Sequence, residues 1–177
     1  QPSEMEWFSN YPARIKGRQD IEIRPNVSGF LTELLVDESS LVKKGDVLFV
    51  VDTIPYKAAL KIAEANVEAA KASTETARLT AENKRELQKK GIISEYDLQM
   101  AENDYASAQA HLAQAEAQLV NARNNDSYTR VTSPLTGIVG SIPYRVGSLV
   151  SSATATPLTT VSDNSEMDVY FSMTEKQ

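Results

Sequence analysis

Cysteine is absent from this chain of 177 residues, and histidine occurs only once. Without thiols the chain has no disulfide, no thiolate metal site and no cysteine nucleophile, and the redox compartment in which it works stays open. One histidine supplies too few imidazoles for a histidine-based metal centre and makes a Ser-His-Asp triad close to impossible. The composition therefore points away from an enzyme.

Positive charge is also scarce, because 18 Lys and Arg face 24 Asp and Glu, which gives a formal net charge of −6. A chain without a basic excess has no counterion-release drive toward nucleic acid or anionic lipid. The longest apolar run, from Val47 to Val51, is far shorter than the roughly 20 residues that cross a bilayer. The first residues carry neither a basic start nor an apolar stretch, so any export signal or membrane anchor is expected upstream.

Both ends of the chain have the pattern of short strands. Residues 20–24 and 128–132 alternate between polar and apolar side chains, as half-buried strands do. The run from Val47 to Val51 has the composition of a buried strand, and polar turns such as 43–46 separate these segments. Short strands between turns predict a small barrel or sandwich.

The middle of the chain has a helical composition. Seventeen of the twenty Ala lie from Ala58 to Ala122, and Gly91 is the only Gly or Pro between those two residues. Alanine and long unbranched side chains favour helix because they lose little rotamer freedom there. Lys89-Lys90-Gly91 predicts a helix end, whereas Ser94 followed by acidic residues predicts the N-cap of a second helix. Asn124-Asn125-Asp126 is expected to end that second helix.

Heptad spacing indicates how the two helices pair. In the second helix, large residues recur every seven positions and an alanine follows each of them three positions later, which is the seam of an antiparallel coiled coil. The first helix repeats the pattern more weakly. At 1.5 Å per residue, arms of this length predict a hairpin roughly 50 Å long. The main seam residues are expected to be Leu60, Val67, Leu98, Tyr105, Leu112 and Leu119.

A second row of small residues lies off this seam. It has two interpretations: simple helix propensity on a solvated surface, or close lateral packing against another hairpin. The row consists of Ala106, Ala110, Ala113 and Ala117.

The two strand blocks repeat one another in sequence. Residues 25–31 and 133–139 share the order proline, apolar residue, glycine, apolar pair, and each leads on to a Gly-x-x-Leu/Val segment. An internal duplication split by the hairpin is the natural inference. Its turn positions are Gly29, Gly45, Pro134, Gly137 and Gly147.

These motifs, taken in order, resemble the periplasmic adaptor family, also called membrane fusion proteins. The order is Pro-x-Val-Ser-Gly, Val-Lys-Lys-Gly-Asp-x-Leu, the Ala-rich hairpin, and Tyr-Thr-x-Val-x-Ser-Pro-x-x-Gly-x-Val-Gly. Within the family the chain is most similar to AcrA/MexA-like adaptors of resistance–nodulation–division (RND) efflux pumps, from about Ile15 to Met173.

The resemblance implies an α+β fold. It consists of a lipoyl-like β-sandwich of two half-motifs, an inserted antiparallel α-helical coiled-coil hairpin, and strands of an incomplete β-barrel domain. The expected division is an N-terminal tail with the first barrel strand (1–19), the first half-motif (20–54), the hairpin (55–126), the second half-motif (127–163) and the start of a truncated barrel domain (164–177). The barrel strands are expected near Tyr11 to Gly17 and near Met167 to Met173.

The resemblance also implies a function. It predicts a non-enzymatic periplasmic adaptor, without cofactor or metal, anchored to the inner membrane through a segment outside this chain. Its implied partners are an inner-membrane RND transporter, an outer-membrane channel and further copies of itself in a ring, hexameric in the assembled pump, with no nucleic acid. The exported substrates are drugs or other small molecules; an adaptor of an ABC-type efflux or type I secretion system is the alternative.

The family's hairpin tip docks on the outer-membrane channel. The family's Arg, Leu and Ser positions at that tip correspond to Asn83, Leu87 and Ser94. The turn residues Gly91, Ile92 and Ile93 are expected to complete the tip, because apolar residues exposed at a turn fit an interface. Asn83 departs from the family pattern, because an Arg is usual there and the nearest cations, Lys84 and Arg85, are displaced by one and two residues. Ser39 departs as well: it stands where a Gly is usual, and we expect it to make that turn less able to adopt a positive φ.

Two other classes share parts of this pattern. Biotinyl and lipoyl carriers have the same half-motif sandwich, but they present one Lys at a tight hairpin between the halves, where this chain has its helices. No Lys follows Gly29 or Gly137 in such a setting. A purely structural coiled-coil protein is the other alternative, and the flanking duplicated halves argue against it.

Overall fold

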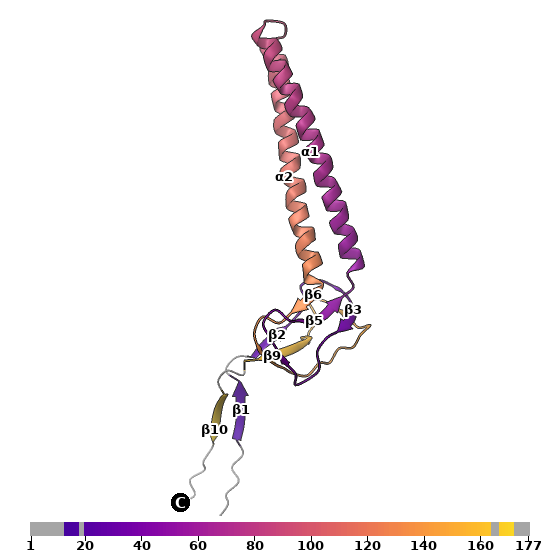
Figure 1. Cartoon of the computed structure of the whole chain (residues 1–177), viewed down its shortest axis with the longest axis vertical. Helices are drawn as coiled ribbons and strands as arrows, with labels where there is room; N and C mark the ends of the chain where they lie inside the picture. Colours follow the sequence, from indigo (N-terminus) through magenta and orange to yellow (C-terminus); the bar gives the residue numbers. More distant parts are fainter. Residues whose placement is uncertain (1–12, 18–19, 164–166, 172–177) are drawn as a thin grey trace, which may run out of the picture.

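A long helical hairpin stands on a small β-sandwich, and a separate pair of strands lies on the other side of the sandwich (Figure 1). The computed structural model describes residues 13–17, 20–163 and 167–171. The mixed helix and strand class expected from the sequence is confirmed.

The hairpin consists of α1 (Ile54–Lys89, 36 residues) and α2 (Glu95–Tyr128, 34 residues). Pro55 lies in the first turn of α1, where a missing N–H removes no helical hydrogen bond. At 1.5 Å per residue the arms reach about 50 Å from the sandwich. No helix in the described part of the chain is long and apolar enough to cross a membrane.

The end of α2 lies beyond the expected stop at Asn124-Asn125-Asp126. The helix continues to Tyr128, which was expected to begin a strand. Two hydroxyl groups donate hydrogen bonds to backbone carbonyls of the last turn. Ser127 Oγ donates to the Asn124 oxygen at 2.7 Å, and Thr129 Oγ1 donates to the Asp126 oxygen at 2.6 Å. Short polar side chains that cap their own helix thus extend it past a sequence that usually ends one.

The sandwich contains two four-stranded antiparallel sheets with the orders β2-β9-β7-β4 and β6-β5-β3-β8. Each sheet contains two strands from before the hairpin and two from after it. In the inferred duplication β2, β3, β4 and β5 correspond to β6, β7, β8 and β9, and exchanging each strand for the corresponding one converts the first order into the second. The strands are β2 (Asp20–Ile23), β3 (Gly29–Leu34), β4 (Leu41–Val42), β5 (Val47–Val51), β6 (Arg130–Thr132), β7 (Gly137–Val139), β8 (Leu149–Val150) and β9 (Thr159–Ser162).

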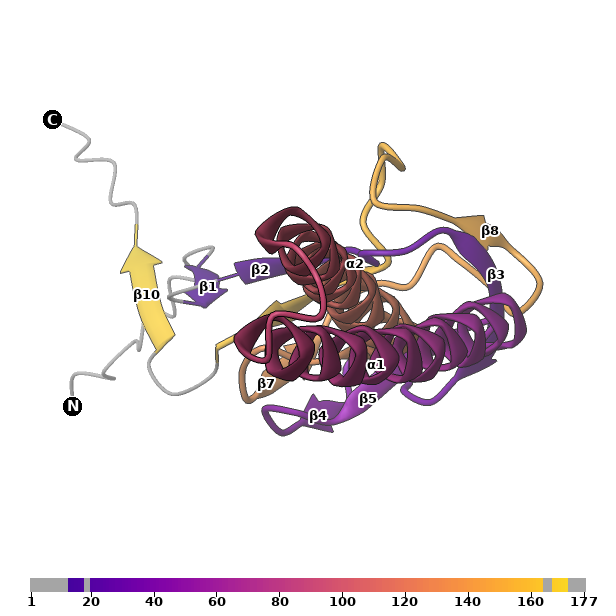
Figure 2. The same ribbon diagram turned by 90° about the horizontal axis from the view of Figure 1, so that it is seen from above.

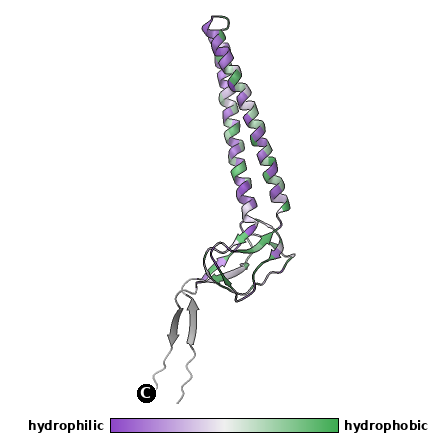
Figure 3. Cartoon of the chain, viewed as in Figure 1, coloured by the Kyte–Doolittle hydropathy of each residue, from purple (hydrophilic) through white to green (hydrophobic). Residues whose placement is uncertain are grey.

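The core lies between these two sheets and draws on both halves of the chain. The strands that line it are among the most apolar segments of the molecule (Figure 3). Each sheet contains strands of both halves, so the two halves share one core. The fully buried hydrophobic side chains are Leu31, Leu48, Phe49, Val51, Val139, Val150, Leu158 and Val161.

Equivalent turns in the two halves use the same chemistry. Gly45 and Gly147 have φ values of 91° and 93°, which favour glycine because a Cβ crowds the backbone there. The following residue closes each turn with its side chain: Asp46 Oδ2 accepts from the Lys43 N–H at 2.9 Å, and Ser148 Oγ accepts from the Arg145 N–H at 3.2 Å. The duplication inferred from sequence is therefore visible in the backbone.

Ser39 does not prevent a positive φ, contrary to expectation, since its φ is 64°. Hydrogen bonds around the turn impose this conformation. The Ser39 N–H donates to the Val139 oxygen at 2.8 Å, and Ser40 Oγ donates to the Asp37 oxygen at 2.6 Å. The turn is thereby tied to β7 of the opposite half.

Outside the sandwich, β1 (Ala13–Gly17) pairs antiparallel with β10 (Met167–Phe171). Seen from above, this pair lies apart from the sandwich sheets (Figure 2). Residues 11–12 and 172–173, at the outer ends of the expected barrel strands, lie outside the described residues. The assignment of this pair to a barrel domain stays a prediction.

Candidate docking tip and hairpin surface

The tip of the hairpin is closed by a Schellman motif. The Ile92 N–H donates to the Leu87 oxygen at 3.0 Å, and the Gly91 N–H donates to the Gln88 oxygen at 2.9 Å. Gly91, with a φ of 70°, supplies the left-handed residue that this motif requires. The motif therefore ties together two of the expected docking residues, Leu87 and Ile92, through the backbone.

The second helix begins as the sequence predicts. Ser94 is its N-cap, and Ser94 Oγ accepts from the Asp97 N–H at 3.2 Å. Glu95 and Asp97 place negative charge in the first turn, where the helix macrodipole favours it. Ser94 thus has a structural role in addition to the docking role implied for it.

The expected docking residues gather at this end of the molecule, with one exception. Leu87 and Ile93 are half-buried, whereas Gly91, Ile92 and Ser94 are exposed. Asn83 is also exposed, but it lies one helical turn further down α1. Five of the six residues therefore form one small surface.

Two exposed apolar residues that were not expected extend this surface along α2. Ile92, Tyr96 and Met100 are 64%, 72% and 49% exposed. Ile92 lies in the turn before α2, and the spacing of four residues places Tyr96 and Met100 on one side of the first turns of α2. That spacing is the signal by which sequence reasoning could have found Tyr96 and Met100. Large apolar side chains grouped at the exposed end of a molecule are typical of a protein interface.

Two cations near the tip already have carboxylate partners. Arg85 donates to Glu102 Oε1 of α2 at 3.2 Å, so its guanidinium already bridges the two helices. Lys89 pairs with Glu86 at 3.3 Å within α1. Arg85, which is displaced by two residues from the family position, therefore helps to hold the hairpin together.

Further down α1, Arg78 lies between two carboxylates. Its guanidinium pairs with Glu75 at 2.5 Å and with Glu82 at 2.6 Å. The hydrogen bond from Arg78 lowers the pKa of Glu75, and the two carboxylates raise the pKa of Arg78. All three side chains are exposed enough for solvent to screen them, so this group stabilises the surface of α1 only modestly.

The contact between the helices follows the heptad positions, which are buried or half-buried along both arms. Small residues dominate it, since Ala63, Ala81, Ala101 and Ala115 are among its buried members. Thr74 lies in this row and donates across it to the Ala108 oxygen at 3.1 Å. Alanines at these positions let the two backbones approach closely.

The outward faces of the two helices are also apolar. α1 exposes Ile62 and Leu79, with alanines between them, and α2 exposes Val120 together with the expected alanine row. These faces point away from the seam, one on each side of the hairpin.

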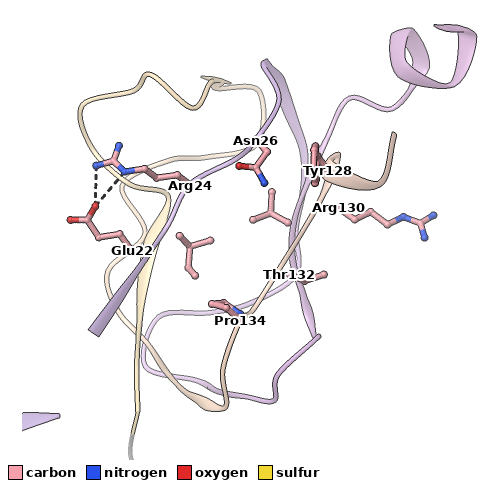
Figure 4. A pocket seen from close by; sticks show the side chains of 9 residues that line it. Glu22, Arg24, Asn26, Tyr128, Arg130, Thr132 and Pro134 are labelled. Carbon is pink, nitrogen blue, oxygen red and sulfur yellow. Dashed lines mark hydrogen bonds and ion pairs between the residues drawn. The ribbon is translucent and has the colours of Figure 1, made fainter. Parts of the chain in front are cut away.

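The sandwich continues both faces. Below α1, Phe30 of β3 and Leu149 of β8 are direct cross-strand neighbours, 56% and 64% exposed. On the opposite edge, below α2, a cavity of about 280 Å³ opens between the edge strands β2 and β6. Glu22 and Arg24, paired at 3.1 Å, border one side of it (Figure 4). Tyr128 and Pro134 lie across from them.

The described residues hold no group of three or more His, Cys, Asp or Glu side chains placed to bind a metal ion. The turn positions of the half-motifs lie in the sandwich, away from the tip: Gly29, Gly45, Pro134, Gly137 and Gly147.

A helical hairpin inserted between two interlocked halves of a β-sandwich is the architecture of a barrel-sandwich hybrid domain. Residues 19–162 match the family described as RND MFP, barrel-sandwich hybrid domain. The chain belongs to this family of membrane fusion proteins, which confirms the resemblance drawn from its motifs.

Individual relatives agree with this assignment. The chain is 34% identical over 180 residues to the efflux pump periplasmic linker BepD of Brucella suis biovar 1, covering 100% of this chain and 45% of BepD. The crystal structure of ZneB from Cupriavidus metallidurans has a TM-score of 0.64 at 28% identity, covering 90% of this chain and 67% of that one. A MacA-MexA chimera with the Pseudomonas aeruginosa MexA α-hairpin has a TM-score of 0.60 at 30% identity, covering 92% and 53%. The chain thus spans less than half the length of BepD.

Proposed function

We propose that this chain is the part of a periplasmic adaptor that extends toward the outer membrane and docks there. In this proposal the whole protein is anchored at the inner membrane and links an RND transporter there to an outer-membrane channel, so that drugs or other small molecules leave the cell. The observation that carries the proposal is the exposed apolar tip at the end of a hairpin about 50 Å long. The similarity to an efflux pump periplasmic linker supports it.

The role of the protein is mechanical, without catalysis or a cofactor. The tip would contact the channel through Leu87, Gly91, Ile92, Ile93 and Ser94, with Tyr96 and Met100 widening the contact along α2. An exposed Ile92 costs free energy in water and gains it when a partner covers the side chain. The Schellman motif fixes its position, so little conformational entropy is lost on docking.

A photo-crosslink tests this contact. A benzophenone amino acid replaces Ile92 in the full-length adaptor in its native host, and mass spectrometry identifies the trapped protein. We expect an outer-membrane channel. The matched control carries the same amino acid at Val120, which is similarly exposed but lies far from the tip. No channel at Ile92, or equal capture at Val120, contradicts the docking role.

A charge variant tests whether docking matters for export. Ile92→Asp places a carboxylate on the exposed tip without touching the Ser94 cap, and we expect it to abolish drug resistance while the far-UV circular dichroism stays unchanged. Leu41→Asp, at an exposed side chain of β4 that lies outside both the tip and the two edges considered below, is the control and keeps resistance. Full resistance with Ile92→Asp excludes the tip as the docking surface.

We also propose that copies of the adaptor form a ring, with six copies in the assembled pump. Each molecule has two unlike edges. One is apolar and runs along α1 and the Phe30–Leu149 pair; the other runs along the alanine row of α2 and the cavity between β2 and β6, which the Glu22–Arg24 ion pair borders. An edge that matches the opposite edge of the next copy produces a head-to-tail contact, and such contacts form a ring when the rotation from one copy to the next closes. The small side chains of the alanine row allow neighbouring hairpins to approach closely.

Disulfide trapping tests the head-to-tail contact, because the chain has no cysteine of its own. Phe30→Cys on one edge and Pro134→Cys on the other are made as separate variants of the full-length protein. We expect disulfides when the two variants are mixed and none when either is oxidised alone. Disulfides within one variant would mean a symmetric two-fold contact and would exclude the ring.

A further inference from the structure

Asp126, in the last turn of α2, has a carboxylate oxygen that is buried and has no hydrogen-bond donor. A buried acceptor without a partner is rare in folded proteins and costs free energy. The position adds to this cost, because the C-terminal end of a helix disfavours negative charge and the last turn of α2 contains no basic residue. A conformation in which a neighbouring donor reaches this carboxylate oxygen of Asp126 is therefore favoured.

A cavity at the base of the hairpin leaves room for a donor to approach Asp126. This cavity of about 580 Å³ lies between the first turns of α1, the last turn of α2 and β6, and both Lys57 and Asp126 line it. The two helices are farther apart at this end than at the tip (Figure 1). Lys57 is exposed, and no ion pair is recorded for it among the described residues.

The register of the hairpin places these two residues at the same level. Thr74 of α1 contacts the Ala108 oxygen of α2. Counting equally along both helices from that contact toward the sandwich reaches Lys57 on α1 and Asn125 on α2, next to Asp126. Both residues line the same cavity, at the end of the hairpin where the helices have separated.

We propose that Lys57 and Asp126 form a clasp at the base of the hairpin. In the closed state the Lys57 ammonium crosses the cavity and donates to the Asp126 carboxylate; the structure described above is the open state. The clasp goes beyond the docking function, because it concerns two conformations of the hairpin itself. A change of about 5° at the base moves the end of an arm about 50 Å long by about 4 Å, so the clasp decides where the tip points.

Other charges surround the same region and define the controls. Arg130 of β6 lines the cavity as well, Arg123 lies one turn before Asp126 on α2, Lys61 lies one turn beyond Lys57 on α1, and Asp52 precedes α1. Only Lys57 lines the cavity from the opposite helix as a cation, which is why it is assigned as the partner of Asp126.

Distances between two spin labels test the clasp. Glu64→Cys and Gln118→Cys lie level with one another on the two helices, are exposed, and supply the only thiols of the chain. Double electron–electron resonance on this parent should show a shorter and a longer distance. Lys57→Met and Asp126→Asn should each reduce the shorter population about threefold, whereas Lys61→Met and Arg130→Met leave it unchanged. In about 1 M salt, which shortens the screening length to about 3 Å, the parent should also lose the population at the shorter distance.

Several outcomes overturn the clasp. They are a single distance in the parent, a shorter population that survives Lys57→Met, and a loss caused by Arg130→Met rather than by Lys57→Met. Circular dichroism confirms that each variant is folded. If Asp126→Asn does not fold, the exchange of Lys57→Asp with Asp126→Lys provides the second test, because it should restore the shorter distance that Lys57→Met removes.

Discussion

Thr74 of α1 lies 3.1 Å from the carbonyl oxygen of Ala108 of α2, and its hydroxyl group also lies 2.8 Å from the Ala70 oxygen of its own helix. It is the one seam residue of the described hairpin for which a hydrogen bond to the facing backbone is recorded. Thr74 therefore adds a polar contact between the two helices to a seam that otherwise packs through apolar side chains.

We expect Thr74→Val to destabilise the protein by about 0.5–1.5 kcal/mol. Valine keeps the shape of threonine but removes the hydroxyl group that reaches Ala108. Thr80→Val is the matched control, because Thr80 bonds only to the Thr76 oxygen of its own helix, and it should change the free energy of unfolding by less than about 0.5 kcal/mol. Urea denaturation measures both, and equal effects would show that the cross-helix bond contributes nothing.

Ser39→Gly should stabilise the protein by about 0.5–1 kcal/mol. Serine at a φ of 64° carries the steric cost of the left-handed region, and glycine removes this cost while adding some entropy to the unfolded chain. Ser40→Gly should instead destabilise, because it loses the hydrogen bond from Ser40 Oγ to the Asp37 oxygen. Thermal unfolding distinguishes the two, and a lower melting temperature for Ser39→Gly would contradict the argument.

Gly137 and Gly147 should respond differently to substitution. A Cβ on Gly137 would lie 2.1 Å from the Ser162 oxygen, so Gly137→Ala must separate β7 from β9 and should cost about 2–3 kcal/mol. A Cβ on Gly147 meets nothing within 4 Å, but its φ is 93°, so Gly147→Ala should cost about 1–2 kcal/mol. Asparagine, which tolerates positive φ, should reduce the cost at Gly147 and leave that at Gly137 undiminished. Denaturant unfolding of the four variants checks this.

Glu75 should titrate below the ordinary range of glutamate, because the hydrogen bond from Arg78 lowers its pKa. A pKa that is lower in the folded state adds stability above the pKa of the unfolded chain, and this stability is lost as the pH falls through the folded value. Arg78→Met should return the Glu75 pKa toward its ordinary value, whereas Lys71→Met, which removes the separate pair with Glu68, should not. Carbon-detected NMR titration measures the shift.

The hairpin was the most predictable part of the fold. Its signals are local: alanine content, heptad spacing, Gly91 as the left-handed residue and Ser94 as the cap all act within a few turns of helix. The α2 end was missed because the hydroxyls of Ser127 and Thr129 act against the usual stop signal.

The exchange of strands between the two sheets depends on contacts that local patterns do not contain. Residues 137–139 predict a strand, but nothing in them indicates that β7 pairs with both β4 and β9. The positive φ of Ser39 has the same origin, since hydrogen bonds to a distant strand impose it. Tyr96 and Met100 at the tip were missed for another reason: their spacing is visible, but exposure is known only once the seam is located.

The hairpin is attached to the sandwich through two neighbouring strands of one sheet. α1 follows β5, α2 precedes β6, and these two strands are antiparallel neighbours in one sheet. In topological terms the whole hairpin is therefore the loop of a β-hairpin, and its length is independent of the sandwich. Adding or removing one heptad in each arm changes the reach by about 10 Å while every strand contact stays in place, so one sandwich can carry hairpins of different lengths.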